Sequence, residues 1–410
     1  MISKIITKAD NYFDEVVSFS GISVTHNDIL KGIANTGNLS AIAEVLKKAI
    51  NKEKITICFF GGSITAGASA TTPPPPESGI DIKLPKEENI YCNRIANWFR
   101  EVFGCEVDMC NAGIGATDTQ LATHRLTEDV LCYKPDLVIN EWAMNDNPNM
   151  SQKWKTYESV VRKLLKEGIA VLLYSFCGIA GNTAQEVHTP VAVFYDLPML
   201  SYKDAFFSHE KFLYFSNDKV HPNQLGHPMA ALQICDFLTD VLKNLNNIST
   251  YKPTIPKTTY HPLADTYNGA YVARFKDIED GLHNGIRIID RGSFEPESEL
   301  RHHGKRELTP YTAAYSENYK PMIIEVDSAK SVHLLNYKRK CLDDGSYMLK
   351  INGKEIVDES LNCACGHSFD YVWASDRVYY CEEAEKLSIE IIPTCKNQED
   401  FVSIFALLLV

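Results

Sequence analysis

The stretch Ile55–Gly67, ITICFFGGSITAG, decides the fold class, because six mostly apolar residues lead directly into two glycines and a serine. A continuous apolar run of this length is typical of a strand buried on both faces of a parallel sheet. In open parallel sheets, ligands bind at the carboxyl ends of the strands. Ser63 would therefore lie where a ligand binds, and it is either a nucleophile or only the cap of a following helix.

Strands and helices alternate from this segment to about residue 250. Further apolar runs of strand length occur at 105–111, 136–142, 169–176 and, more weakly, 195–200. Apolar residues at helical spacing predict helices at 40–50, 89–103, 119–132, 154–167 and 223–245. Strands that alternate with helices predict βαβ units and a parallel sheet. We therefore expect an α/β domain over residues 53–250, preceded by a lead-in segment, residues 1–52.

The pattern changes after a predicted linker at residues 254–259. Short β-rich runs replace the helices, and Asn352-Gly353 between two of them is a strong hairpin signal. The runs are 270–275, 285–290, 321–327, 331–337, 347–351, 370–375, 377–382, 386–392 and 400–410. Many short strands separated by turns predict an antiparallel β-sandwich domain over residues 260–410.

The composition narrows the function classes. The chain has 410 residues and a net charge of −12, which argues against nucleic-acid and anionic-membrane partners because both attract clustered Lys and Arg. Lys4 and Asp10 interrupt the N-terminal apolar residues, so we read no signal peptide and expect a cytoplasmic protein. No window holds the roughly 18 apolar residues of a membrane-spanning helix.

The twelve cysteines are expected to be mostly free, buried thiols, since no export signal points to an oxidising compartment. Cys363, Cys365 and His367 lie close together, but their spacing matches no standard zinc pattern. We therefore expect neither a metal nor a cofactor.

Asp218-Lys219-Val220-His221-Pro222 is a second stretch with catalytic potential. The short spacing can place the carboxylate of Asp218 beside the imidazole of His221, as in a serine triad. By itself the pattern is weak, because a surface histidine near a turn aspartate reads the same way.

Two more strand ends carry candidate residues. Asn145 follows the strand at 136–142 and could direct its amide at an oxyanion, or it could simply form an Asx turn. After the strand at 105–111, glycines in NAGIGAT (111–117) would let a backbone N–H approach a ligand, or they form a plain turn.

In the order Ser, Gly, Asn and Asp-His, these stretches resemble the four sequence blocks of the SGNH hydrolases, also called the GDSL family. The blocks here are GGSIT, NAGIGAT, AMND and DKVHP, and the resemblance covers about residues 53–245. It implies a flavodoxin-like three-layer α/β sandwich with a parallel sheet. It also implies Ser63 as nucleophile, His221 as base and Asp218 as the residue that orients it.

The resemblance further implies three oxyanion donors. They are the N–H of Ser63, the side chain of Asn145 and a backbone N–H in the second block, from Gly115 or, in a register shifted by one, Ala116. The chain departs from the family pattern in having Gly-Gly-Ser-Ile instead of Gly-Asp-Ser-Leu. The triad is not affected, because its acid is Asp218. Ala143 also replaces a usual glycine.

The resemblance implies a serine esterase that works through an acyl-enzyme. We favour short-chain esters, above all acetyl esters of carbohydrate, because no long apolar lid is present and the loops 68–90 and 177–190 are polar. The substrate would then be a small-molecule or oligosaccharide ester. An O-acyltransferase with the same triad and a non-catalytic glycan-binding protein are the alternatives. Aromatic residues of the β-rich region could stack on sugars or belong to its core: Tyr271, Trp373, Tyr379 and Tyr380.

Overall fold

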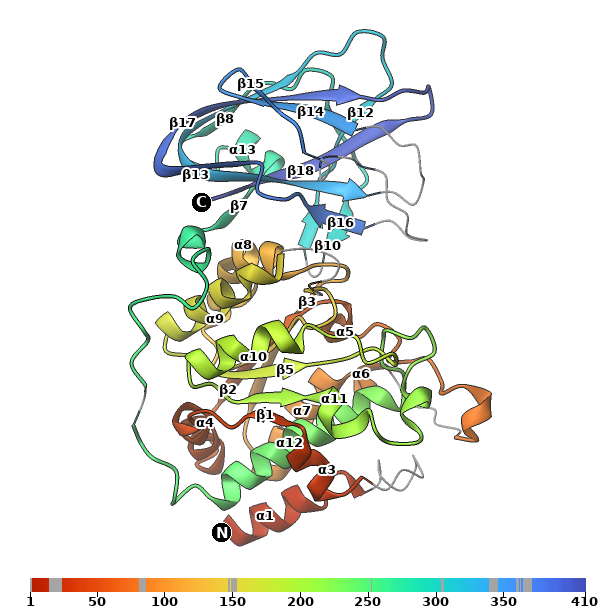
Figure 1. Cartoon of the computed structure of the whole chain (residues 1–410), viewed down its shortest axis with the longest axis vertical. Helices are drawn as coiled ribbons and strands as arrows, with labels where there is room; N and C mark the ends of the chain where they lie inside the picture. Colours follow the sequence, from red (N-terminus) through yellow and green to blue (C-terminus); the bar gives the residue numbers. More distant parts are fainter. Residues whose placement is uncertain are drawn as a thin grey trace. The chain divides into compact units, whose positions relative to one another are not determined.

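The computed structural model of this chain forms two units. It describes residues 2–14, 24–80, 86–146, 148, 153–251, 253–303, 306–338, 346–358, 361, 363 and 371–410. Unit 1 comprises Met1–Ala122 and Leu126–Asp265, and unit 2 comprises Thr123–Arg125 and Thr266–Val410 (Figure 1). Of the helices that the structure describes, none has the length and apolar character to cross a membrane.

Unit 1 is an α/β unit built on a six-stranded sheet. Its main elements are α1 (Ile2–Asp10), α3 (His26–Lys31), β1 (Ile33–Asn35), α4 (Ser40–Ile50), β2 (Ile55–Gly61), α5 (Ser63–Ala66), α6 (Lys86–Asn89), α7 (Tyr91–Phe103), β3 (Val107–Gly113), α8 (Thr119–Asp129), β4 (Leu137–Glu141), α9 (Tyr157–Lys166), β5 (Ala170–Ser175), α10 (Gln185–Phe194), β6 (Met199–Ser201), α11 (Tyr202–Phe206) and α12 (Gly226–Lys243). Strands β3, β2, β4, β5 and β6 are parallel in that order, and β1 pairs antiparallel with β6. Five parallel strands in this sequence have the 2-1-3-4-5 order of flavodoxin-like folds, which confirms the predicted fold class.

The apolar run of β2 is buried because helices cover both faces of the sheet (Figure 1). Ile57 and Phe59 belong to a core with apolar residues of α4, α7 and α12. Cys58 and Phe60 point to the opposite face and belong to a second core with residues of α8, α9 and α10. The alternation of side chains along one strand thus supplies both cores, and the three-layer sandwich follows.

Several elements of unit 1 were not predicted. The segment expected as a polar loop at 177–190 forms α10 from Gln185 onward, although Pro190 lies inside that helix. Proline and polar residues hide the helical pattern, and packing against the sheet outweighs propensity. Within the segment expected as a lead-in, β1 is only three residues long and is hydrogen-bonded to β6 at the sheet edge.

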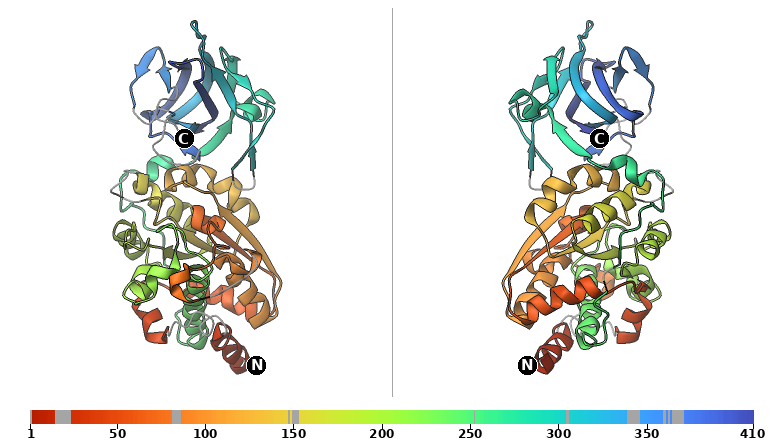
Figure 2. Two further views of the ribbon diagram at one scale, coloured as in Figure 1. Left: turned by 90° about the vertical axis from the view of Figure 1, so that its right-hand side faces the viewer. Right: turned by 90° about the vertical axis from the view of Figure 1, so that its left-hand side faces the viewer.

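Unit 2 is a strongly bent antiparallel sheet, in agreement with the predicted β-sandwich (Figure 2). Its elements are β7 (Tyr271–Arg274), α13 (Phe275–Glu279), β8 (Ile286–Asp290), β9 (Glu295–Pro296), β10 (Arg301–His303), β11 (Arg306–Leu308), β12 (Tyr311–Ala314), β13 (Met322–Lys338), β14 (Ser346–Ile351), β15 (Lys354–Ile356), β16 (Tyr371–Ala374), β17 (Tyr379–Thr394) and β18 (Phe401–Leu409). The hairpin signal at Asn352-Gly353 is confirmed: both residues have positive φ, 52° and 77°, and they join β14 to β15.

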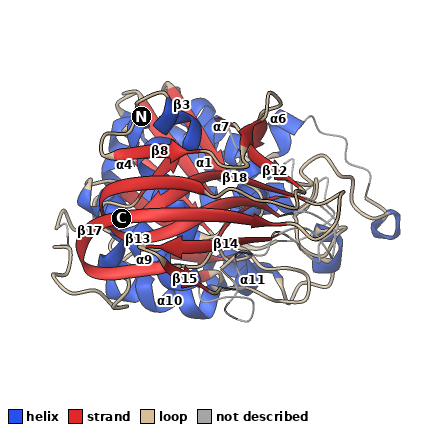
Figure 3. Cartoon of the chain, turned by 90° about the horizontal axis from the view of Figure 1, so that it is seen from above, coloured by secondary structure: helices blue, strands red, loops and turns tan. Residues whose placement is uncertain are grey.

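The long strand β13 explains how one sheet forms two layers. The runs predicted at 321–327 and 331–337 are continuous, with irregular register between Val326 and Ser331. Its first part pairs with β8 and its second part with β18, while β14, β17, β13 and β18 run side by side (Figure 3). Bulges bend a strand, so β13 can take part in both layers.

The predicted linker at 254–259 is held against α9. Nη1 of Arg162 donates to the carbonyl oxygen of Pro256 at 2.8 Å. Oε1 of the buried Glu158 accepts the backbone N–H of Tyr260 at 2.6 Å. The division into units places this segment, up to Asp265, in unit 1.

Candidate active site

Ser63 is the first residue of α5, directly after Gly61 ends β2 and Gly62 caps the helix. A Cβ atom on Gly61 would lie 2.2 Å from Oγ1 of Thr65, and one on Gly62 would lie 2.6 Å from Oδ1 of Asn145. Glycine is therefore required at both positions by close approach. The second contact shows that the Asn145 side chain lies against the peptide that carries Ser63.

The strand order explains why Ser63 and Asn145 meet. Ser63 follows β2 and Asn145 follows β4, and these two strands are neighbours in the sheet. From β2 the chain passes to β3 on one side, and from β3 it crosses to β4 on the other. Such a reversal of strand order opens a crevice at the carboxyl ends of the strands, where α/β proteins bind ligands.

Ser63, His221 and Asp218 form a continuous hydrogen-bonded chain. Oγ of Ser63 lies 2.8 Å from Nε2 of His221, and Nδ1 of His221 lies 2.7 Å from Oδ2 of Asp218. A proton on Nδ1 is then bound to the carboxylate, and Nε2 can accept the hydroxyl proton. The isolated bridge between Ser216 and Pro222 closes the loop that holds the Asp and the His together.

The carboxylate of Asp218 is stabilised in its charged form. Burial acts to raise its pKa, but hydrogen bonds from the backbone N–H of His221, the His221 ring and the backbone N–H of Val220 outweigh burial and lower the pKa. The two N–H groups lie 2.7 and 2.9 Å from Oδ1. Asp218 thus stays ionised and can hold the imidazole in one tautomer.

A second histidine nearby, His227, is not suited to the role of base. It is buried, and burial lowers its pKa to about 4. Its Nε2 lies 3.1 Å from the carbonyl oxygen of Ala68, to which the ring N–H donates. Its ring stacks on Tyr91 at 6.1 Å between centroids.

The second block also lies beside the nucleophile. A Cβ atom on Gly115 would have Cβ of Ser63 as its nearest neighbour, at 3.8 Å. Ala116 has a φ of 57°, a left-handed conformation that costs a non-glycine residue free energy. The structure therefore brings the predicted residues Ser63, Asn145 and Gly115 together, with Ala116 next in the chain and strained.

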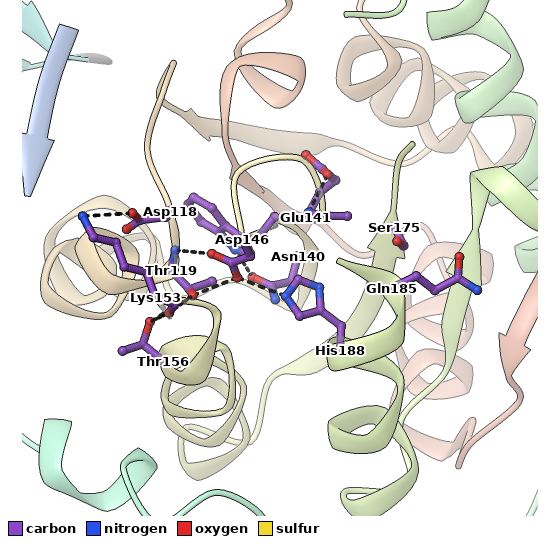
Figure 4. Close-up of polar contacts among 12 residues, drawn as sticks. Asp118, Thr119, Asn140, Glu141, Asp146, Lys153, Thr156, Ser175, Gln185 and His188 are labelled. Carbon is purple, nitrogen blue, oxygen red and sulfur yellow. Dashed lines mark hydrogen bonds and ion pairs between the residues drawn. The ribbon is translucent and has the colours of Figure 1, made fainter. Parts of the chain in front are cut away.

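Sequence reasoning missed a group of buried polar residues behind this crevice (Figure 4). Asp146 and His188 are 0% and 1% exposed, and Nε2 of His188 lies 3.0 Å from Oδ2 of Asp146. Asp146 was part of the third block but had no role assigned, and His188 lies in the segment expected as a loop. A period of apolar residues could not reveal either side chain, because both are polar.

Glu141, the last residue of β4, is a further buried carboxyl group at this end of the sheet. Its Oε1 accepts the backbone N–H of Ala143 at 3.1 Å. Burial raises the pKa of Glu141 to about 8. The group is therefore mostly neutral at pH 7.

Metal ligands were also sought. Among the described residues, His26, Asp236 and Asp240 on α3 and α12 form a group whose ligand atoms could hold an ion. Nδ1 and Nε2 of His26 lie 2.8 and 3.2 Å from the two carboxylates, so the ring already binds both. Of the Cys-Ala-Cys-Gly-His stretch considered above, Cys363 is buried, whereas Cys365 and His367 lie outside the described residues.

Comparison with known proteins finds relatives by structure alone: no family model and no curated protein matches this chain. A two-domain esterase (CEX) active on acetylated mannans has 22% sequence identity and a TM-score of 0.73 over 94% of this chain and 98% of that chain. The same esterase co-crystallised with mannopentaose gives a TM-score of 0.70 with the same identity and coverage. A protein of the G-D-S-L family from Desulfitobacterium hafniense DCB-2 covers 45% of this chain at a TM-score of 0.35 and 16% identity.

At such identities the similarity concerns the fold. The chain has the two-domain fold of the acetyl-mannan esterase, an α/β unit followed by an antiparallel β unit. The prediction drawn from the SGNH resemblance is thereby confirmed at the level of the fold.

Proposed function

We propose that this chain is an SGNH-type serine esterase that removes short acyl groups, above all acetyl groups, from carbohydrate. The observation that carries the proposal is the chain of hydrogen bonds from Ser63 through His221 to Asp218. It lies at the carboxyl end of β2, beside Asn145, in the crevice where the strand order reverses. Nucleophile, base and orienting acid at hydrogen-bond distance are the arrangement required for acyl transfer.

The proposed reaction has two steps. Nε2 of His221 takes the hydroxyl proton as Oγ of Ser63 attacks the ester carbonyl, and Asp218 stabilises the imidazolium that forms. The same proton passes to the alcohol oxygen as the carbon–oxygen bond breaks, which leaves an acyl-enzyme. Water, deprotonated by His221, then attacks the acyl-enzyme, and the carboxylic acid and free Ser63 are regenerated.

The negative charge on the carbonyl oxygen needs donors that are in place before the reaction. We assign this role to the N–H of Ser63, the side-chain amide of Asn145 and a backbone N–H of the second block. The position of Gly115 next to Ser63 favours Gly115 over Ala116 as the source of the third donor. The left-handed conformation of Ala116 turns the backbone at this point.

The substrate class rests on the two-domain fold. The esterase that shares the fold over nearly its whole length is described as active on acetylated mannans, and one of its structures contains mannopentaose. An acetylated oligosaccharide is therefore the substrate we propose here. Among the aromatic residues considered for sugar stacking, Tyr380 is 44% exposed, with the Arg377 guanidinium 4.4 Å from its ring centroid. Tyr271, Trp373 and Tyr379 are half-buried.

The test is hydrolysis of p-nitrophenyl esters from acetate to octanoate, followed by acetylated mannan and xylan oligosaccharides. We expect acetate to react fastest. Ser63→Ala should lose about a thousandfold or more in kcat, the scale for a triad member. Ser78→Ala, in the loop that follows α5, is the matched control and should behave as the parent.

Two outcomes would count against this function. If Ser63→Ala matches the parent, Ser63 is not the nucleophile. If a sugar hydroxyl captures the acyl group in preference to water, the enzyme is an O-acyltransferase with the same triad. Glycan binding without turnover in the parent would identify a non-catalytic binding protein.

A further inference from the structure

A cluster of buried polar side chains lies next to the proposed oxyanion donors, and the mechanism above does not use it (Figure 4). Its centre is Asp146, which is fully buried and follows Asn145 in the chain. A buried carboxylate costs several kcal/mol unless it is hydrogen-bonded. Its hydrogen bonds therefore indicate what it holds in place.

Asp146 joins the two chain segments that carry oxyanion donors. Oδ1 accepts the backbone N–H of Thr119 at 3.0 Å, and Oδ2 accepts the Thr119 hydroxyl at 2.8 Å. Thr119 is the first residue of α8, directly after the turn that contains Gly115 and Ala116. One carboxylate thus connects the residue next to Asn145 with the end of the second-block turn.

His188 completes the hydrogen bonding of Asp146 from a third element, α10. Its Nε2 lies 3.0 Å from Oδ2 of Asp146, and because a carboxylate only accepts, the ring N–H donates. The ring stacks on Tyr157 of α9 with 3.6 Å between centroids and 8° between planes. The backbone N–H of Ala184, just before α10, donates to the carbonyl oxygen of Ala143 at 2.8 Å.

The other parts of the second-block turn are also anchored. At its start, the N–H of Ile114 donates to the carbonyl oxygen of Gly61 at 3.1 Å. At its end, Asp118 caps α8, and the buried Lys153 lies 3.5 Å from the Asp118 carboxylate. The strained Ala116 lies between these two anchors, so loss of one anchor would let the turn relax.

We propose that Asp146 and His188 are positioning residues for the oxyanion side of the site. Together they fix Asn145 and the turn at 115–117 relative to Ser63, without contacting the substrate. The inference rests on the proposed function, and it adds two residues that the SGNH blocks left without a role.

The expected signature is a fall in kcat with little change in KM, because the donors act on charge that develops only in the transition state. His188→Leu removes the N–H donor, and a misplacement of the donors by about 1 Å can cost about a hundredfold in rate. We expect kcat for p-nitrophenyl acetate to fall between about tenfold and a hundredfold. His188→Gln restores an N–H donor and should recover most of this loss.

A matched control separates positioning from general loss of packing. Thr239 is also buried in unit 1, on α12, and its hydroxyl bonds only within its own helix, to the Cys235 carbonyl oxygen at 2.7 Å. Thr239→Val should change the melting temperature but not kcat. If His188→Leu also lowers only the melting temperature, the positioning role is refuted.

A double-mutant cycle gives the decisive test. His188→Leu is measured in the parent and in Asn145→Ala, with two readouts: ester hydrolysis and the rate at which a fluorophosphonate labels Ser63, followed by intact mass. If His188 acts through the oxyanion donors, its substitution costs several-fold less in the Asn145→Ala background. An equal factor in both backgrounds would overturn the proposal.

The same assays separate this inference from the function on which it rests. A parent that neither hydrolyses esters nor is labelled at Ser63 refutes the esterase itself. A parent that does both, together with an unchanged His188→Leu, refutes only the positioning role.

Discussion

Two glycines of the crevice provide the sharpest test of the oxyanion geometry. A Cβ atom at position 62 would lie 2.6 Å from Oδ1 of Asn145, about 0.8 Å closer than the 3.4 Å at which ordinary contact begins. The φ of Gly62 is −90°, which any residue can adopt, so backbone strain is not the problem. Gly62→Ala must therefore displace the Asn145 amide, or move the peptide that carries Ser63.

The expected cost is that of one lost oxyanion donor, roughly 10²–10³ in kcat or about 2.7–4 kcal/mol. Gly115→Ala is the matched control: its Cβ would have a nearest neighbour at 3.8 Å, and the backbone N–H is retained. We expect Gly115→Ala to keep kcat within about threefold of the parent, since an ordinary contact requires no rearrangement.

The assay is kcat and KM for p-nitrophenyl acetate, with the melting temperature as a check on folding. Asn145→Ala and the double variant with Gly62→Ala complete the comparison, because two changes that remove the same donor should not add. A Gly62→Ala enzyme within threefold of the parent, or a fully additive double variant, would refute the reasoning. The same holds if the Gly115→Ala enzyme is the more damaged of the two.

Two further predictions concern the buried charges of unit 1. Because burial raises the pKa of Glu141 to about 8 from 4.5, the unfolded chain releases this proton first as pH rises, and the parent loses stability between about pH 4.5 and 8. Glu141→Gln can still accept from Ala143, so thermal melts at pH 5 and pH 8 should show the variant gaining on the parent by about 1.4 kcal/mol per pH unit at most; a constant difference would contradict this. Arg162→Leu removes the bonds to Pro256 and the ion pair with Asp265, which should cost about 3 kcal/mol and speed proteolysis of residues 256–261, whereas Lys166→Leu on the exposed face of α9 should not; equal cleavage of the two variants would disprove the anchoring.

Much of the α/β unit could be predicted from residue pattern. The helix at 40–50 and the strand at 55–60 were predicted nearly to the residue, because an amphipathic period and an unbroken apolar run report burial directly. Boundaries shifted where the ends of elements are polar: the strand predicted at 105–111 is Val107–Gly113. The β unit was predicted in kind, but β13 was divided in two, since its bulged centre interrupts the alternation that marks a strand.

The residues of the candidate site were visible in the sequence because short motifs fix local geometry. The spacing of Asp218 and His221 allows one loop to hold both, and Gly61 and Gly62 end the strand so that Ser63 is displayed. Their roles in catalysis stay a prediction, which the substitutions above can test.

Sequence alone determined the alternation of strands and helices, the abrupt end of β2 at Ser63 and the hairpin at Asn352-Gly353, because each depends on neighbouring residues and on burial of one strand or helix face. Only the tertiary structure decided that His188 meets Asp146, 42 residues earlier in the chain, and that both lie behind the crevice. A buried polar contact between distant segments leaves no periodic signal, since it depends on the sheet order that brings α8, α10 and the end of β4 together.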